Sequence, residues 1–280
     1  MKVALWSASP RLGNVAANVE TVAKAVLGKE ADLVVFPEMF LTGYAIGDDV
    51  QRLALRPDDS RLAPLLAACR KAKAHAIVGT PRTPRRGITH NSALLVAPDG
   101  AVSWYDKRAL ATFTTFDEGR HFTRGSSSPV WETPLGRIGI GICYDLYFPE
   151  FQKRQVLEGA DILVNISASP ATSRRFFETL LEARAVENAC FSLYSNNVGA
   201  QDGIVFWGGA RAVGPRGQLL KEVKPYKQGR AVVDLDMDDL RAAREFRPTL
   251  RDSDPKDVEA VDRLQRSKPA GRRARRRPRP

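Results

Sequence analysis

Three residues of this chain could together perform nucleophilic chemistry: Cys143, Glu38 and Lys107. A cysteine thiol has a reference pKa of about 8.5, so it needs a nearby base or positive charge in order to attack a substrate at neutral pH. Glu38 and Lys107 each end a hydrophobic, strand-like run and could supply both. The ordinary alternatives are a small buried cysteine and two solvated charges at strand ends.

Cys143 stands where the sequence RIGIGICYDLYFPE changes from a strand pattern to a helix pattern. Side chains alternate along a strand, so the three isoleucines share one face and the two glycines share the other face with Cys143. Glycine inside a strand often marks the close approach of a ligand or another backbone. Pro149 and Glu150 suit the first turn of a helix. The sequence therefore predicts Cys143 at a strand end, where α/β folds expose reactive groups.

The elements around these residues alternate as they do in α/β proteins. Apolar runs bounded by turn residues are separated by amphipathic patterns, for example over residues 18–27 and 61–74. Proline and glycine at 98–100 and 214–217 predict two tight turns between antiparallel strands, so the sheet should be mixed. No linker divides the first 245 residues or so, which favours one domain.

Four ordered motifs resemble the nitrilase, or carbon–nitrogen hydrolase, superfamily over nearly the whole body of the chain. They are FPEMFLTGY, then YDKRAL with FDEGRHF, then GICYDLYFPE, then VNISASP with FWGGAR. The resemblance implies a catalytic triad of Glu38, Lys107 and Cys143, with Glu118 positioning the lysine or the substrate. It also implies a four-layer α–β–β–α sandwich with mixed sheets.

The implied reaction is hydrolysis of a non-peptide carbon–nitrogen bond in a small amide, such as an ω-amide, a carboxamide or an N-carbamoyl compound. Glu38 would deprotonate Cys143, whose thiolate would form a thioester and release ammonia or an amine. Lys107 and the backbone N–H of Tyr144 would stabilise the charged oxygen. Through their match to family motifs, Tyr44, Tyr144 and Trp207 are predicted to bind the substrate.

The residues after Cys143 favour the amidase and carbamoylase branch of the superfamily. True nitrilases usually have Trp–Glu there, whereas this chain has Tyr144 and Asp145. Nitrile hydrolysis and acyl transfer on the same site are the alternatives. Many amidases have arginine where Tyr147 stands, so a substrate carboxylate has no assigned partner. Arg174 and Arg175 are candidates for that role, although a solvated helix start is the favoured explanation of both.

The sequence calls for no metal or organic cofactor, because its three histidines are isolated and no C-x-x-C pair occurs. Family members commonly pair through two helices, which correspond here to about residues 149–159 and 174–188, so a homodimer or larger homo-oligomer is expected. The short apolar N-terminal run and the lack of a long apolar stretch predict a soluble, cytoplasmic protein without a membrane partner.

The positive net charge of +11 is concentrated at the C-terminus. Residues 266–280 contain eight basic residues and no acidic one, which leaves 35 basic against 32 acidic residues elsewhere. We therefore expect a single hydrolase domain over residues 1–262 and a basic, disordered tail over residues 263–280. A non-catalytic scaffold that binds nucleic acid through this tail is the rival hypothesis, although the tail lacks aromatic residues for base stacking.

Overall fold

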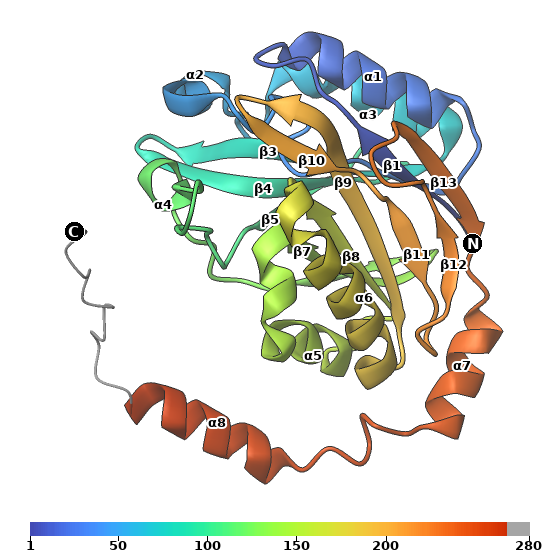
Figure 1. The fold of residues 1–280 in the computed structure, drawn as a ribbon. Helices are drawn as coiled ribbons and strands as arrows, with labels where there is room; N and C mark the ends of the chain where they lie inside the picture. Colours follow the sequence, from blue (N-terminus) through green and yellow to red (C-terminus); the bar gives the residue numbers. More distant parts are fainter. Residues whose placement is uncertain (268–280) are drawn as a thin grey trace.

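The computed structural model describes residues 1–267, and Figure 1 shows how their helices and strands are arranged. The predicted disordered tail lies largely outside the described residues, since it covers residues 263–280. Its first five residues are the end of helix α8 (Pro255–Ser267). In Figure 1, α8 stands apart from the main body of the molecule.

The described strands form one continuous, curled sheet of mixed direction. Its first half contains β5 (Val102–Asp106), β4 (Ile88–Val96), β3 (His75–Arg85), β2 (Leu33–Val35) and β1 (Lys2–Ala8), in that order. Its second half continues with β9 (Phe191–Gln201), β8 (Ile162–Ser167), β7 (Gly136–Ile142) and β6 (Val130–Thr133). The remaining strands lie off this path: β10 (Ile204–Trp207), β11 (Arg211–Val213), β12 (Leu219–Glu222) and β13 (Gly229–Asp234). The short pairing of Ser7 with Asn196 and of Ala8 with Asn197 joins the two halves.

The predicted mixture of strand directions is confirmed. Strands β1, β2 and β3 are parallel neighbours, as are β7, β8 and β9. The two predicted turns connect antiparallel pairs, β4 with β5 and β11 with β12. Gly100 and Gly217 have φ values of +84° and +82° in these turns, a conformation that favours glycine.

The two halves of the sheet pack face to face, and this contact forms the central core of the molecule. The isoleucines of β7 are fully buried there against apolar residues of β1, β2, β3 and β8. The outer face of the first half is covered by α1 (Val15–Leu27) and α3 (Ala63–Ala72), and that of the second half by α5 (Pro149–Leu157) and α6 (Arg174–Asn188). The predicted four-layer α–β–β–α sandwich is therefore confirmed.

Gly139 and Gly141 of β7 face helix α5. A Cβ atom on Gly139 would lie 3.0 Å from the side chain of Gln155, and one on Gly141 would lie 3.3 Å from the ring of Phe151. The close approach that the sequence indicated is therefore made by a packed helix. This packing fixes the strand that leads to Cys143.

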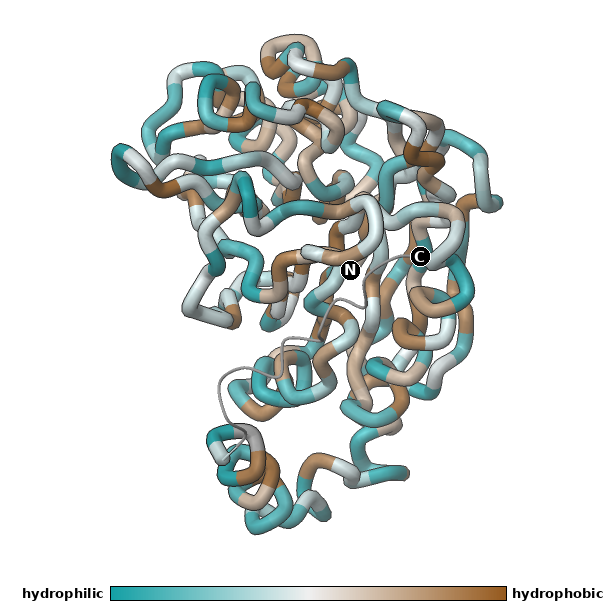
Figure 2. Tube along the Cα trace, turned by 60° about the vertical axis from the view of Figure 1, so that its left-hand side comes forward, coloured by the Kyte–Doolittle hydropathy of each residue, from teal (hydrophilic) through white to brown (hydrophobic). Residues whose placement is uncertain are grey.

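Several short helices connect the larger elements. They are η1 (Gly47–Asp49), α2 (Val50–Leu53), η2 (Ser60–Leu62), α4 (Glu118–His121), η3 (Cys143–Tyr147), η4 (Ala171–Ser173) and α7 (Met237–Phe246). Figure 2 shows hydrophobic residues interspersed with hydrophilic ones along α8, away from the body. No helix within residues 1–267 is both long and apolar enough to cross a membrane.

Candidate active site

Cys143 lies at the junction of strand β7 and the tight helical turn η3, as predicted from its sequence context. Its backbone φ is +48°, in the left-handed region that residues other than glycine rarely adopt. Such strained residues cluster at active sites, where the surrounding structure holds them in place. The Cys143 side chain is half-buried and lines a pocket. The turn therefore presents the sulfur atom to an incoming ligand.

Asp145 holds this turn in place through hydrogen bonds. Its buried carboxylate accepts hydrogen bonds from the N–H groups of Ile142 (2.9 Å) and Ala109 (2.8 Å) and from the hydroxyl of Tyr105 (2.7 Å). Burial raises the pKa of Asp145. Because Ala109 lies two residues after Lys107, the same carboxylate ties the cysteine turn to the lysine segment. The sequence analysis gave Asp145 no such role.

Glu38 is fully buried three residues beyond the end of β2. Its Oε1 accepts hydrogen bonds from Lys107 Nζ (2.8 Å) and Asn91 Nδ2 (2.7 Å), and its Oε2 accepts one from the backbone N–H of Ala168 (2.6 Å). Gly79 makes room for this segment, since a Cβ atom there would lie 2.4 Å from the Glu38 Cα. Asn91 and Ala168 are contributions that the sequence analysis missed.

Lys107 is buried between two carboxylates. Its Nζ donates to Glu38 Oε1 at 2.8 Å and to Glu118 Oε1 at 2.7 Å. Glu118, at the start of α4, also accepts from the Tyr44 hydroxyl at 3.0 Å and from the N–H of Ala111 at 2.9 Å. An ammonium group has three donors, so two hold the carboxylates and the third remains for another acceptor.

The charges of this cluster act on one another. Burial raises the pKa of Glu38, and the Lys107 charge opposes that shift. Burial favours a lower pKa for Lys107, but the Glu118 and Glu38 charges outweigh it and hold the pKa well above its usual value. Burial and the Glu38 charge raise the pKa of Cys143 well above that of an ordinary thiol. The resting site therefore pairs a cationic lysine with a neutral thiol.

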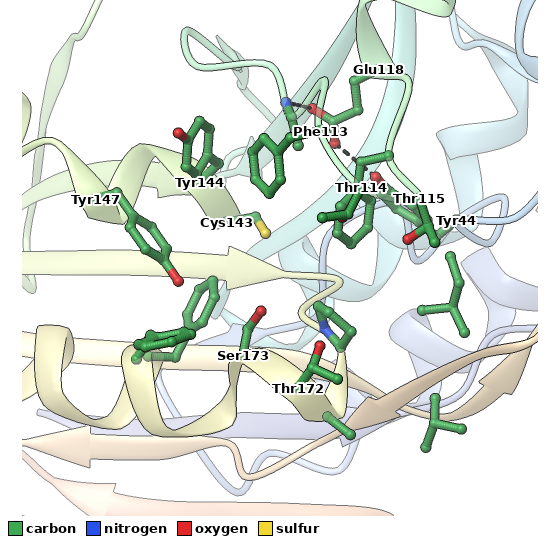
Figure 3. Close-up of a pocket in the computed structure, with 18 of the residues that line it drawn as sticks. Tyr44, Phe113, Thr114, Thr115, Glu118, Cys143, Tyr144, Tyr147, Thr172 and Ser173 are labelled. Atoms are coloured by element: carbon green, nitrogen blue, oxygen red, sulfur yellow. Dashed lines mark hydrogen bonds between the residues drawn. The ribbon is translucent and has the colours of Figure 1, made fainter. Parts of the chain in front are cut away.

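A pocket of about 1000 Å³ opens over the cysteine (Figure 3). Cys143, Glu118, Tyr44 and Tyr144 are among the predicted site residues that line it. The other lining residues are Ala111, Phe113, Thr114, Thr115, Phe116, Tyr147, Pro170, Ala171, Thr172, Ser173, Phe176, Phe177, Gly203, Ile204 and Val205. In Figure 3, Tyr144, Phe113 and Tyr147 lie on one side of the sulfur, with Ser173 and Thr172 on the other.

Trp207, predicted to bind the substrate, does not line this pocket. It is fully buried and stacks on Tyr194, with ring centroids 5.4 Å apart. Its Nε1 donates to Ser169 Oγ at 3.3 Å, and the guanidinium of Arg211 lies over its ring. Trp207 is therefore a core residue, because its large ring fills space between β10, β9 and α6.

The pocket wall also contains residues that the sequence analysis did not assign. Phe113 and Phe116 lie in the segment between Lys107 and Glu118, which has no regular structure and gives no periodic signal. Tyr147, noted only as a departure from the arginine of many amidases, lines the pocket from η3. Within residues 1–267, no group of three His, Cys, Asp or Glu side chains could hold a metal ion.

Comparison with known proteins gives consistent matches. The family described as carbon–nitrogen hydrolase matches residues 2–245. An (R)-stereoselective amidase from a Pseudomonas species is 33% identical over 257 residues, which cover 90% of this chain and 91% of that protein. The ω-amidase YafV of Escherichia coli K12 is 31% identical over 80% of this chain and 84% of its own.

A solved structure shows the same fold with a covalently modified cysteine. It is a variant of the amidase from Nesterenkonia sp. AN1, in which glutamine replaces a glutamate and the acetamide moiety of fluoroacetamide is bound to the active-site cysteine. The TM-score is 0.79 at 26% identity, over 93% of this chain and 96% of that chain. The family match over residues 2–245 and the two similar amidases show that this chain belongs to the carbon–nitrogen hydrolase family.

Proposed function

We propose that this protein hydrolyses the carbon–nitrogen bond of a small amide through a thioester on Cys143. The observation that carries the proposal is the buried cluster of Glu38, Lys107 and Glu118 directly beside the cysteine that lines the pocket. Together, the cluster and Cys143 supply a base, a fixed positive charge and a nucleophile in one place. The acetamide adduct shows that the active-site cysteine of the Nesterenkonia amidase is nucleophilic, which supports this role for Cys143.

In the first step, Glu38 takes the Cys143 proton while the sulfur attacks the carbonyl carbon of the amide. The raised pKa of Cys143 means that the thiolate forms with the attack and is not the resting species. Negative charge then develops on the carbonyl oxygen. The third Lys107 N–H and the backbone N–H of Tyr144 are the donors that we assign to this oxygen.

In the second step, the tetrahedral intermediate collapses and the carbon–nitrogen bond breaks. Glu38 passes its proton to the leaving nitrogen, so ammonia or an amine departs and a thioester remains on Cys143. Glu38 then removes a proton from water, which attacks the thioester and releases the acid and the free thiol. Glu118 holds Lys107 in place throughout and touches no reacting atom.

Three broader features belong to this proposal. Residues 1–262 act as one catalytic domain, which the family match over residues 2–245 supports. The protein forms a homodimer or larger homo-oligomer through α5 and α6, and the exposed Leu157 at the end of α5 supports such a contact. The location is cytoplasmic, which three free cysteines support.

A panel of amides, N-carbamoyl amino acids and nitriles tests the proposed reaction. We expect ammonia release from amides and, when the enzyme is quenched during turnover, a mass gain on the intact protein equal to the acyl group. The adduct should map to the peptide containing Cys143. An adduct on Cys69 or Cys190 instead would contradict the thioester mechanism.

The pH dependence of kcat/KM should report the ionisation of Glu38, the proposed buried base. Glu38 must be ionised to accept the thiol proton, and burial raises its pKa. We therefore expect kcat/KM to fall with decreasing pH along an acid limb whose midpoint lies above about 4.3, the value for an ordinary glutamate. The midpoint belongs to the coupled cluster as a whole. Circular dichroism at each pH separates this limb from unfolding, and a midpoint at or below the ordinary value would exclude a buried base.

A further inference from the structure

The pocket over Cys143 is much larger than a simple aliphatic amide requires. Its volume of about 1000 Å³ lies at the upper end of the range for small-molecule sites, roughly 300 to 1,000 Å³. Three apolar residues at its wall are exposed in the structure: Phe113 (44%), Phe176 (58%) and Val205 (49%). They come from three separate segments, and all three line the same pocket.

Aromatic side chains form a continuous arc along the wall. From Phe116 the arc runs to Phe113 with ring centroids 6.0 Å apart, then to Tyr144 at 4.9 Å, Tyr147 at 5.2 Å and Phe177 at 5.8 Å. The rings are tilted or perpendicular to one another, so the arc presents both edges and faces. This is the packing that a further aromatic ring prefers, with centroid distances of about 4.5 to 7 Å.

Among residues 1–267, no residue that lines the aromatic arc offers a positive charge to a substrate. Glu118 is the one acidic residue in the described lining, which contains no lysine, arginine or histidine. Its carboxylate is already bound by Lys107, Tyr44 and the N–H of Ala111. A substrate carboxylate placed along the aromatic arc would therefore lose water without gaining a partner.

The two arginines closest in sequence to the pocket wall do not change this conclusion. Arg174 follows the lining residue Ser173, but its guanidinium is paired with Glu178 at 2.9 Å. Arg175 is exposed, and neither arginine lines the pocket. The candidates that the sequence offered for a carboxylate site thus lie outside the pocket lining.

The part of the site next to Glu38, the proposed base, has room for a small leaving group only. Glu38 must approach the departing nitrogen, yet it is 0% exposed and enclosed by Lys107, Asn91 and the backbone of Ala168. A bulky amine would not fit there, whereas ammonia would. The large part of the substrate is therefore the acyl group, which extends from the Cys143 sulfur along the aromatic arc.

Building on the proposed amidase function, we propose that the substrate is a primary amide with a bulky, apolar and uncharged acyl group, about the size of an arylalkanoyl group. Water adds and the carbon–nitrogen bond breaks, giving the corresponding carboxylic acid and ammonia. Amides that carry a carboxylate, such as ω-amides of dicarboxylic acids and N-carbamoyl amino acids, are poor substrates of this site.

Three matched compounds test the substrate class with the full-length protein: 3-phenylpropanamide, 3-(4-carboxyphenyl)propanamide and propanamide. We expect kcat/KM for the first to exceed that of each of the others by about 100-fold, because one lacks the ring and the other adds an unpaired charge. A positive charge in place of Tyr147 should favour hydrolysis of 3-(4-carboxyphenyl)propanamide. The Tyr147→Arg variant should raise its kcat/KM at least about 10-fold relative to that of 3-phenylpropanamide.

Exposed phenylalanines provide matched variants that keep the fold. Phe113→Ala and Phe176→Ala should each lower the preference for 3-phenylpropanamide over propanamide, by about 10-fold. Phe246→Ala is the control, since Phe246 is 75% exposed on α7 and lies outside this pocket. It should leave the preference unchanged.

The outcomes separate the substrate class from the reaction. Cys143-dependent ammonia release with equal or greater kcat/KM for the carboxylated compound or for propanamide would overturn the substrate class and leave the amidase function standing. Unchanged preferences in both Phe113→Ala and Phe176→Ala would also overturn it. No ammonia from any amide would overturn the proposed function, and the substrate class would fall with it.

Discussion

Replacing Cys143 with alanine is expected to lower kcat on the order of a million-fold, the loss typical of removing a covalent nucleophile. No other cysteine can take its place, because the remaining two are fully buried in the core, Cys69 at the α3 layer and Cys190 before β9. Ammonia release and intact-protein mass spectrometry measure the effect. Both the turnover and the acyl adduct should disappear in the Cys143→Ala variant.

The fold should survive this change, which makes the result interpretable. Alanine accepts the same backbone conformation about as well as cysteine does, and the turn is held by the Asp145 hydrogen bonds rather than by the thiol. Cys69→Ala is the matched control: it removes one buried sulfur and should cost about 1 kcal/mol of unfolding free energy with kcat intact. Normal turnover by a folded Cys143→Ala protein would disprove the assignment of the nucleophile.

Replacing Lys107 with methionine is expected to reduce both activity and stability strongly. Methionine keeps a similar length but leaves Glu38 and Glu118 buried side by side without their shared cation. Breaking a buried ion pair from one side typically costs about 3 to 5 kcal/mol of stability. Loss of an oxyanion donor alone lowers kcat by about 100- to 1,000-fold, and the disturbed base adds to this loss.

The stability deficit of Lys107→Met should depend on pH in a defined direction. The Lys107 charge lowers the pKa of Glu38, so its removal raises that pKa further above the unfolded value. A carboxyl whose folded pKa is raised contributes stability that is complete below the unfolded pKa and is lost as the pH rises through the folded pKa. Urea unfolding should therefore show a smaller deficit at pH 5 than at pH 8.

A surface lysine provides the control for this pH dependence. Lys71 is exposed on α3, and Lys71→Met should change stability by less than about 0.5 kcal/mol at either pH. The double variant Lys107→Met/Glu118→Gln should recover part of the stability but not the activity, because it relieves the carboxylate repulsion without restoring the cation. A Lys107→Met deficit that is equal at both pH values would argue against a cation shared by two buried carboxylates.

Local sequence patterns were sufficient to place the reactive residues on their elements. The period-two isoleucines fixed β7 and its buried face, and the change of pattern after Ile142 located Cys143 at its end. The turn residues at 98–100 and 214–217 predicted the antiparallel pairs correctly, because φ preferences of proline and glycine act over a few residues. The motif resemblance then gave the layers of the fold.

Contacts between distant segments could not be predicted in the same way. The N–H of Ala168 binds a carboxylate 130 residues earlier in the chain, and a backbone donor has no sequence signal. The Asp145 carboxylate reaches Tyr105, 40 residues away, only because the two halves of the sheet pack face to face. These partners depend on how whole elements are placed, which no local pattern encodes.

Tertiary structure also decided which aromatic residues line the pocket. Trp207 and Tyr144 both lie in motifs that resemble the family, yet Trp207 is fully buried outside the pocket and Tyr144 lines the pocket. Phe113 and Phe116 come from a segment without periodicity and reach the wall because Glu118 and Asp145 hold the two ends of that segment. The sequence by itself predicted the residues that we propose as nucleophile, base and lysine, since their residue types and motifs are local properties. The tertiary structure alone decided their partners and the shape of the pocket, because burial and charge pairing depend on segments that meet only after folding.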